Sequence, residues 1–110
     1  MSNTLVTTAI SYTNGSPHIG HLYESVLADF IKNLYIIAGK NVKLLTGTDE
    51  HGKKIEETAT KQGISPKELC DKYSNEFKEL NNNLRTKYDH FIRTTDKKHV
   101  ENVQKFLDEV

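Results

Sequence analysis

The stretch Asn14-Gly15-Ser16-Pro17-His18-Ile19-Gly20-His21 joins two segments of contrasting pattern and decides the fold. Before it, Leu5-Val6-Thr7-Thr8-Ala9-Ile10 is rich in β-branched side chains and predicts a strand buried on both faces. After it, apolar residues recur three and four positions apart, which predicts a helix packed on a sheet and ended by Gly39. These residues are Leu22, Val26, Leu27, Phe30, Leu34 and Ile37.

A second strand is expected over Val42-Lys43-Leu44-Leu45-Thr46, closed by Gly47. A strand, a helix and a strand in succession require parallel pairing and a right-handed crossover. We therefore predict an α/β fold, the first half of a doubly wound parallel-sheet domain. Ligands of such sheets bind at the carboxyl ends of the strands, so residues 12–21 and 47–52 should meet at one edge.

The rest of the chain predicts three more helices and a connecting segment. A short surface helix over 52–62 should end at Gly63, and Ser65-Pro66-Lys67-Glu68 has the pattern of a capping box that opens the next helix. Asparagines 81–83 should fray its end, and residues 88–93 should form a connection or a short strand. The last stretch begins near Asp96, and its apolar stripe is still running at Val110, so we expect the natural protein to continue.

Composition limits the classes of protein that the chain can represent. Hydrophobic residues make up 35% of the 110 residues, which is lean for a core on both sides of a sheet. Basic and acidic residues number 15 each, so no net positive charge attracts nucleic acid. The single cysteine, Cys70, excludes an intrachain disulfide and is expected to be a buried filler. No apolar run approaches ~20 residues, so no membrane span is predicted. The first strand follows residues 1–4 directly, which leaves no room for a leader and favours the cytoplasm.

The two histidines are the first candidates for chemistry. A helix that begins here presents unpaired N–H groups and a partial positive charge, which favour a bound phosphate. His18 and His21 would lie on one face of the helix, where each could donate a hydrogen bond to a phosphate oxygen. Gly20 has no Cβ, so a flat nucleobase could approach the backbone. Such spacing by itself is more often a surface histidine pair at a helix start.

A second candidate is the run Asp49-Glu50-His51 after the second strand. A solvated turn is one reading, and a structural metal site is another. Successive side chains point in different directions, however, and hard cations need several converging oxygens. We therefore expect no metal site within this chain and favour a carboxylate directed into the crevice at the strand ends.

His18-Ile19-Gly20-His21 is identical to the HIGH motif of class I aminoacyl-tRNA synthetases. The blocks at residues 9–15, at Thr46-Gly47-Thr48-Asp49-Glu50-His51-Gly52 and at residues 89–95 resemble the methionyl-tRNA synthetase family in particular. The resemblance runs along most of the chain. It implies that residues 1–110 form the N-terminal part of the Rossmann-like catalytic domain, with the remainder of the enzyme absent. A KMSKS-type loop, a zinc-bearing insertion and an anticodon-binding domain are not present in these residues.

The resemblance also implies a function and a role for individual residues. The family forms methionyl-adenylate from methionine and ATP with Mg²⁺, and transfers the methionyl group to tRNA(Met), which would bind through segments not present here. His18 and His21 would contact the reacting phosphates, Gly20 would lie beneath adenine, and Glu24 near adenine or ribose. Methionine would be bound by Ile10, Tyr12 and Asp49, with Asp49 receiving its ammonium group. His51 would support that site or contact the edge of the nucleotide.

Three alternatives remain at this point. The chain could belong to a ligase for another large apolar amino acid, or to a nucleotidyltransferase that shares the His-x-Gly-His pattern. It could also be a nucleotide-binding module without catalysis. The blocks around Tyr12 and residues 46–52 argue against the first two.

Overall fold

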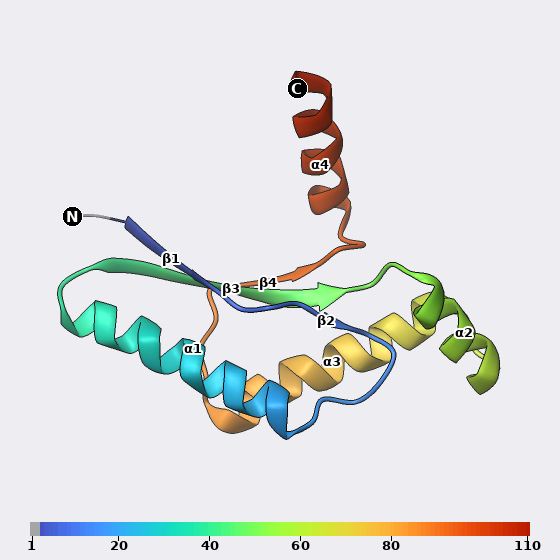
Figure 1. Ribbon diagram of the computed structural model, residues 1–110, viewed down its shortest axis with the longest axis horizontal. Helices are drawn as coiled ribbons and strands as arrows, with labels where there is room; N and C mark the ends of the chain where they lie inside the picture. Colours follow the sequence, from blue (N-terminus) through green and yellow to red (C-terminus); the bar gives the residue numbers. More distant parts are fainter. Residues whose placement is uncertain (1–2) are drawn as a thin grey trace.

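The computed structural model describes residues 3–110 and contains a parallel sheet with four α-helices (Figure 1). Residues 1–2, part of the segment in which no leader was expected, lie outside the described residues. The elements are β1 (Asn3–Thr7), β2 (Ser11–Tyr12), α1 (Ile19–Ile37), β3 (Asn41–Asp49), α2 (Lys53–Gln62), α3 (Pro66–Leu84), β4 (His90–Arg93) and α4 (Lys97–Glu109).

β3 is the central strand, and every other strand pairs with it in parallel. β1 pairs with the first part of β3 and β2 with its end, where Tyr12 lies opposite Asp49. Thr48 pairs both with Ser11 of β2 and with Arg93 of β4, so these two strands occupy opposite edges of β3. The predicted α/β class and parallel pairing are confirmed.

The strand expected over 5–10 is interrupted, which the sequence pattern did not predict. β1 ends at Thr7, and β2 resumes the pairing at Ser11. Between them, the Ala9 N–H donates to Glu24 Oε1 of α1 at 2.6 Å instead of to a strand. A side chain of the helix therefore replaces one partner of the sheet and holds the chain away from β3 at this point.

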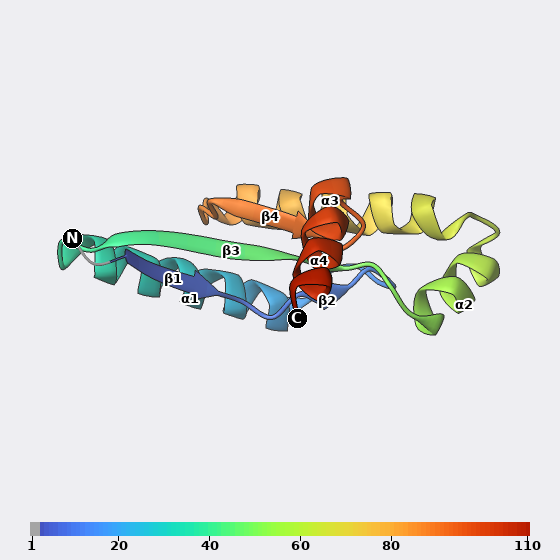
Figure 2. The same cartoon turned by 90° about the horizontal axis from the view of Figure 1, so that it is seen from above.

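Helices α1 and α3 lie on one face of the sheet, and the opposite face is uncovered (Figures 1 and 2). The first strand was expected to be buried on both faces, and this expectation is wrong. Leu5, in β1, is 62% exposed. The side of α1 against the sheet was also mispredicted. Ala28 and Lys32 are its buried residues, whereas the predicted stripe at Phe30, Leu34 and Ile37 is exposed. Lys32 can be buried because its ammonium pairs with Asp89 at 3.0 Å.

A compact core forms where α2 meets α3, and its members are Ile55, Ala59, Leu69, Cys70 and Tyr73. The capping box at Ser65 is confirmed: Ser65 Oγ accepts from the Glu68 N–H, and Glu68 Oε2 accepts from the Ser65 N–H. Cys70 is 3% exposed and fills a gap in this core, as predicted. Fraying at 81–83 is wrong, because α3 continues to Leu84 and the buried Asn81 donates to the Phe77 carbonyl at 2.9 Å.

α4 begins after Asp96 as expected, but it extends away from the sheet (Figure 1). Its apolar residues are exposed, with Val100 at 38% and Leu107 at 66%. The radius of gyration is 15.7 Å, compared with about 13 Å for a compact domain of this length. The extended helix and the open sheet face account for that difference.

Gly47 does not close β3 but lies inside it, paired with Ile92 of β4. A Cβ at this position would overlap the backbone of Ile92, including its carbonyl oxygen. The strands can therefore pair at this distance only because residue 47 has no side chain.

We predict that Gly47→Ala lowers the free energy of unfolding by about 3 kcal/mol, the upper end for overpacking, because backbone rather than a flexible side chain must move. Chemical denaturation would measure the loss. Gly15→Ala is the control, since a Cβ there meets nothing within 4 Å. Equal midpoints for the two variants would contradict the prediction.

Candidate active site

The carboxyl ends of β2 and β3 meet as expected, with Tyr12 opposite Asp49. The first turn of α1 and β2 border a groove to which no residue of 47–52 contributes. This open groove has a volume of about 400 Å³ and is lined by Ile10, Ser11, Tyr12, Asn14, Gly15, Ser16, His18 and His21. A second hollow, of about 170 Å³, is bounded by Tyr12, His51 and the first residues of α2. Tyr12 lies between the two and is shared by both.

His18 and His21 form the cap of α1 through their own ring nitrogens. His18 Nδ1 accepts from the Gly20 N–H at 3.0 Å, and His21 Nδ1 accepts from the His18 N–H at 3.0 Å. A ring nitrogen that accepts carries no proton, so the proton of each neutral ring is on Nε2. The capping bonds thereby leave two Nε2–H donors at the start of one helix, with ring centroids 4.0 Å apart.

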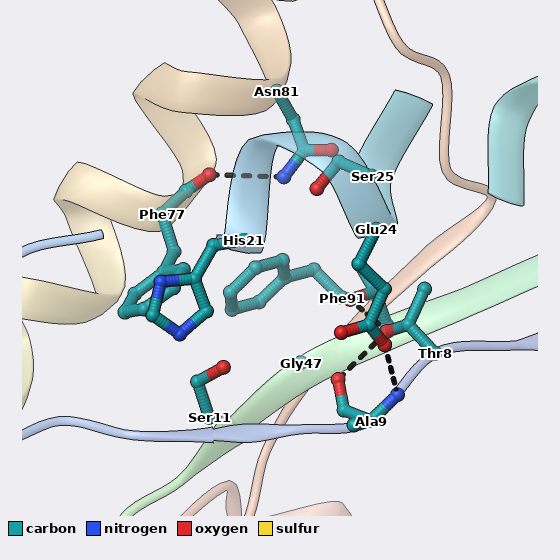
Figure 3. A pocket seen from close by; sticks show the side chains of 11 residues that line it. Thr8, Ala9, Ser11, His21, Glu24, Ser25, Gly47, Phe77, Asn81 and Phe91 are labelled. Atoms are coloured by element: carbon teal, nitrogen blue, oxygen red, sulfur yellow. Dashed lines mark hydrogen bonds between the residues drawn. The ribbon is translucent and has the colours of Figure 1, made fainter. Parts of the chain in front are cut away.

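His21 is held on its other side by α3. Its ring meets Phe77 edge-on, with centroids 4.9 Å apart (Figure 3). Burial lowers the pKa of His21 below its ordinary value of 6.5, the neighbouring His18 lowers it further, and Glu24 opposes both. The surroundings thus favour the neutral ring, which is the form that the capping bond requires.

Gly20 lies under the imidazole of His18. A Cβ at this glycine would approach the His18 ring to 2.8 Å, so a larger residue would displace it. The glycine therefore allows His18 to fold back over the first turn of α1. The contact with adenine expected at Gly20 stays a prediction.

Glu24 lines a small hollow of about 20 Å³ together with His21, Phe77 and Phe91 (Figure 3). Its carboxylate accepts the Ala9 N–H described above and so holds the break between β1 and β2. After this break the chain continues into Ile10 and Tyr12, which line the groove. Glu24 is thus a support for the groove in this structure, and its contact with adenine or ribose stays a prediction.

Asp49 is the last residue of β3 and is half-buried. Its Oδ1 accepts from the His51 N–H at 3.3 Å, and His51 Nε2 is 3.4 Å from the Thr94 carbonyl oxygen. The sequence run that suggested a metal does not converge: within residues 3–110, no three His, Cys, Asp or Glu side chains are grouped to hold an ion.

Sequence reasoning missed the partnership of Glu50 and Arg93. Glu50 is 5% exposed, and both of its carboxylate oxygens accept from the Arg93 guanidinium at 2.7 Å. A signal was present, since a charged residue that directly follows a buried strand needs a partner, and Arg93 closes the neighbouring strand. The contact of Phe77 with His21 had no sequence signal.

A family model described as tRNA synthetases class I (M) matches residues 4–110. The match covers nearly the whole chain, which therefore belongs to the class I tRNA synthetases. Within this class, its relatives are methionine–tRNA ligases. The enzyme of Rhizobium meliloti (strain 1021) is 50% identical over 96 residues, which are 87% of this chain and 19% of that protein. The enzyme of Deinococcus radiodurans is 49% identical over 106 residues, 96% of this chain and 16% of that protein.

A solved structure of Mycobacterium tuberculosis methionyl-tRNA synthetase in complex with methionyl-adenylate has the same fold. The TM-score is 0.89 at 40% identity, over 92% of this chain and 20% of that one. The chain thus spans about a fifth or less of the length of these relatives. None of the helices within residues 3–110 is long and apolar enough to cross a membrane.

We predict that His21 titrates below pH 6.5 and that Glu24→Gln lowers its pKa further, because the variant removes the negative charge that opposes burial. The proton is bound more weakly in the folded state, so the stabilisation from His21 is present above the unfolded pKa and is lost as pH falls through the folded one. An NMR pH titration would measure both values. A His21 pKa at or above 6.5, or a rise in Glu24→Gln, would contradict this reading.

Proposed function

We propose that the protein to which this chain belongs is a methionine–tRNA ligase, which activates methionine with MgATP and transfers it to tRNA(Met). One observation carries the proposal: His18 and His21, each with its ring proton on Nε2, line one groove with Tyr12, which pairs with Asp49 of β3. The 40% identical enzyme solved with methionyl-adenylate supports it. The tRNA would bind through segments outside residues 1–110.

In the first step, a carboxylate oxygen of methionine attacks the α-phosphorus of ATP. The bond to the bridging oxygen of pyrophosphate breaks, and pyrophosphate leaves with its electron pair. Charge develops on the phosphate oxygens, where His18 and His21 would donate from Nε2. Because the capping bonds hold both rings in advance, no reorganisation is needed when the charge appears. Mg²⁺ would enter with ATP as part of the substrate.

Methionine would lie in the groove beside Ile10 and Tyr12, whose aromatic face suits a thioether. Its ammonium would pair with Asp49, opposite Tyr12 on β3. This pair would direct the carboxylate towards the α-phosphate, so Asp49 would contribute to rate as well as to binding. Gly20 and Glu24 are proposed for the adenosine side and His51 for the support of Asp49.

We also propose that the protein acts in the cytoplasm. Relatives described as mitochondrial also occur among the matches, so the mitochondrion is the alternative compartment. Microscopy of the tagged full-length protein in its own cells would decide between the two compartments.

Asp49→Asn keeps the shape of the side chain and removes its charge. We predict that methionine-dependent ATP–pyrophosphate exchange by the full-length protein falls at least about tenfold, since the pair lies in a crevice where it is worth more than the ~0–1 kcal/mol of an exposed salt bridge. ATP affinity should stay within about twofold. Unchanged methionine kinetics would remove Asp49 from the site. Exchange stimulated only by another apolar amino acid would favour the related ligase.

His21→Asn separates capping from donation. The asparagine Oδ1 can replace Nδ1 as acceptor for the His18 N–H, but no donor reaches the position of Nε2. We predict that adenylate formation slows about a hundredfold, or roughly 3 kcal/mol, while methionine affinity is retained. Single-turnover kinetics would measure the rate. His21→Gln, whose amide nitrogen can reach the Nε2 position, should recover part of it. A fully active His21→Asn enzyme would contradict the role in donation.

A further inference from the structure

Glu50 separates two residues of the proposed site, Asp49 and His51, but its own side chain points away from them. Its carboxylate is fully buried and accepts four hydrogen bonds. Two come from Arg93 at 2.7 Å, one from Thr48 Oγ1 at 2.8 Å and one from Thr95 Oγ1 at 3.0 Å. Neither Glu50 nor Arg93 lines the groove, and both line a separate hollow on the side of α3.

Arg93 comes from β4 and meets Glu50 with a planar fork of two N–H donors. Its Nη2 also donates to Asp71 Oδ1 of α3 at 2.6 Å. A fork of this kind fixes the direction of the carboxylate as well as its distance, which the single ammonium of a lysine cannot do. The guanidinium thus ties the end of β3 to β4 and α3 through one side chain.

The backbone around Glu50 is fixed as firmly as its side chain. The Glu50 N–H donates to Thr94 Oγ1 at 2.8 Å, on the β4 side of the strand. On the opposite side, the Asp49 carbonyl accepts from the Thr13 N–H at 3.3 Å. Successive side chains of an extended segment point to opposite sides, so a Glu50 anchored inward leaves Asp49 facing the other way, on the same side of the sheet as its pairing partner Tyr12.

We propose that Glu50 and Arg93 form a positioning pair that sets the orientation of the Asp49 carboxylate for the substrate ammonium. The inference rests on the proposed function, in which Asp49 binds the ammonium group of methionine. Glu50 and Arg93 do not touch the substrate themselves. The pair acts through the backbone of residues 49–51. Loosening it turns the carboxylate of Asp49 without removing that carboxylate or its charge.

The test is Arg93→Lys in the full-length protein, which keeps the positive charge and removes the fork. The expected result is a rise of about tenfold or more in the KM for methionine with the KM for ATP within twofold, since a misplacement of about 1 Å can cost on the order of 100-fold. Asp71→Asn is the matched control. It removes the charge of the other partner of Arg93, leaves the contacts of Glu50 in place, and should keep the KM for methionine within twofold.

A double-mutant cycle shows whether the effect passes through Asp49. Methionine and its analogue without the amino group, 4-(methylthio)butanoate, are compared as ligands by calorimetry. Arg93→Lys should reduce the preference for methionine over this analogue, because only methionine has the ammonium group. In an Asp49→Asn background, Arg93→Lys should have no further effect on that preference, because the group it orients has lost its charge.

A milder pair of variants covers the case in which Arg93→Lys unfolds. Thr95→Val removes one hydrogen bond to Glu50, whereas Thr95→Ser keeps the hydroxyl. Thr95→Val should raise the KM for methionine, as Arg93→Lys does. Thr95→Ser should leave this KM at the wild-type value. Thermal melting of each variant verifies that the measurement is made on folded protein.

Two failures are distinguishable. A wild-type protein with no methionine-dependent exchange would overturn the proposed function and this inference together. An active wild type in which Arg93→Lys and Thr95→Val lower the melting temperature but leave the KM for methionine unchanged would overturn the inference alone. The same holds if Arg93→Lys has an equal effect with and without the Asp49 charge.

Discussion

At Gly47 the backbones of β3 and β4 approach so closely that no side chain fits between them, and the arrangement of the strand edge depends on this approach. It allows the register in which Arg93 lies opposite Thr48. With a larger residue at 47, the backbone of β3 or β4 would have to shift, and with it the position from which Arg93 reaches Glu50. The absence of one Cβ therefore controls contacts several residues away.

Two ion pairs hold β4 at its opposite ends. Before the strand, Asp89 accepts from the Leu44 N–H at 2.7 Å and pairs with Lys32 of α1. These contacts, the bond to Leu44 foremost, hold the pKa of Asp89 below its ordinary value. At the end of the strand, Arg93 pairs with Glu50. Partly buried ion pairs contribute little net stability compared with apolar packing, so we interpret these two as contacts that select one register for a strand of four residues.

Local patterns in the sequence predicted the features that depend on a few neighbouring residues. The capping box at Ser65 and the stop at Gly63 are such features, because glycine at 63 adopts a left-handed φ of 69° and serine supplies its own acceptor. The break after Thr7 was not predictable in this way, since it depends on the Glu24 carboxylate reaching a distant amide. The buried side of α1 was mispredicted for a related reason: Lys32 is admitted to the interior by an aspartate far along the chain. For the candidate site, the pattern indicated both histidines and Asp49, whose roles stay predictions, but it gave no sign of how Arg93 is used.

The setting of Cys70 has a practical consequence for experiments on this chain. Its sulfur accepts a hydrogen bond from Thr13 Oγ1 at 3.0 Å, and burial raises the pKa of the thiol above its ordinary value. Because the thiolate is the form that reacts with alkylating reagents, this sulfur is poorly suited to modification while the protein is folded. Cys70 is also the only cysteine of the 110 residues. A fluorophore or spin label could therefore be attached to a cysteine introduced on an exposed helix such as α4, with the native thiol left in place to report unfolding by becoming reactive.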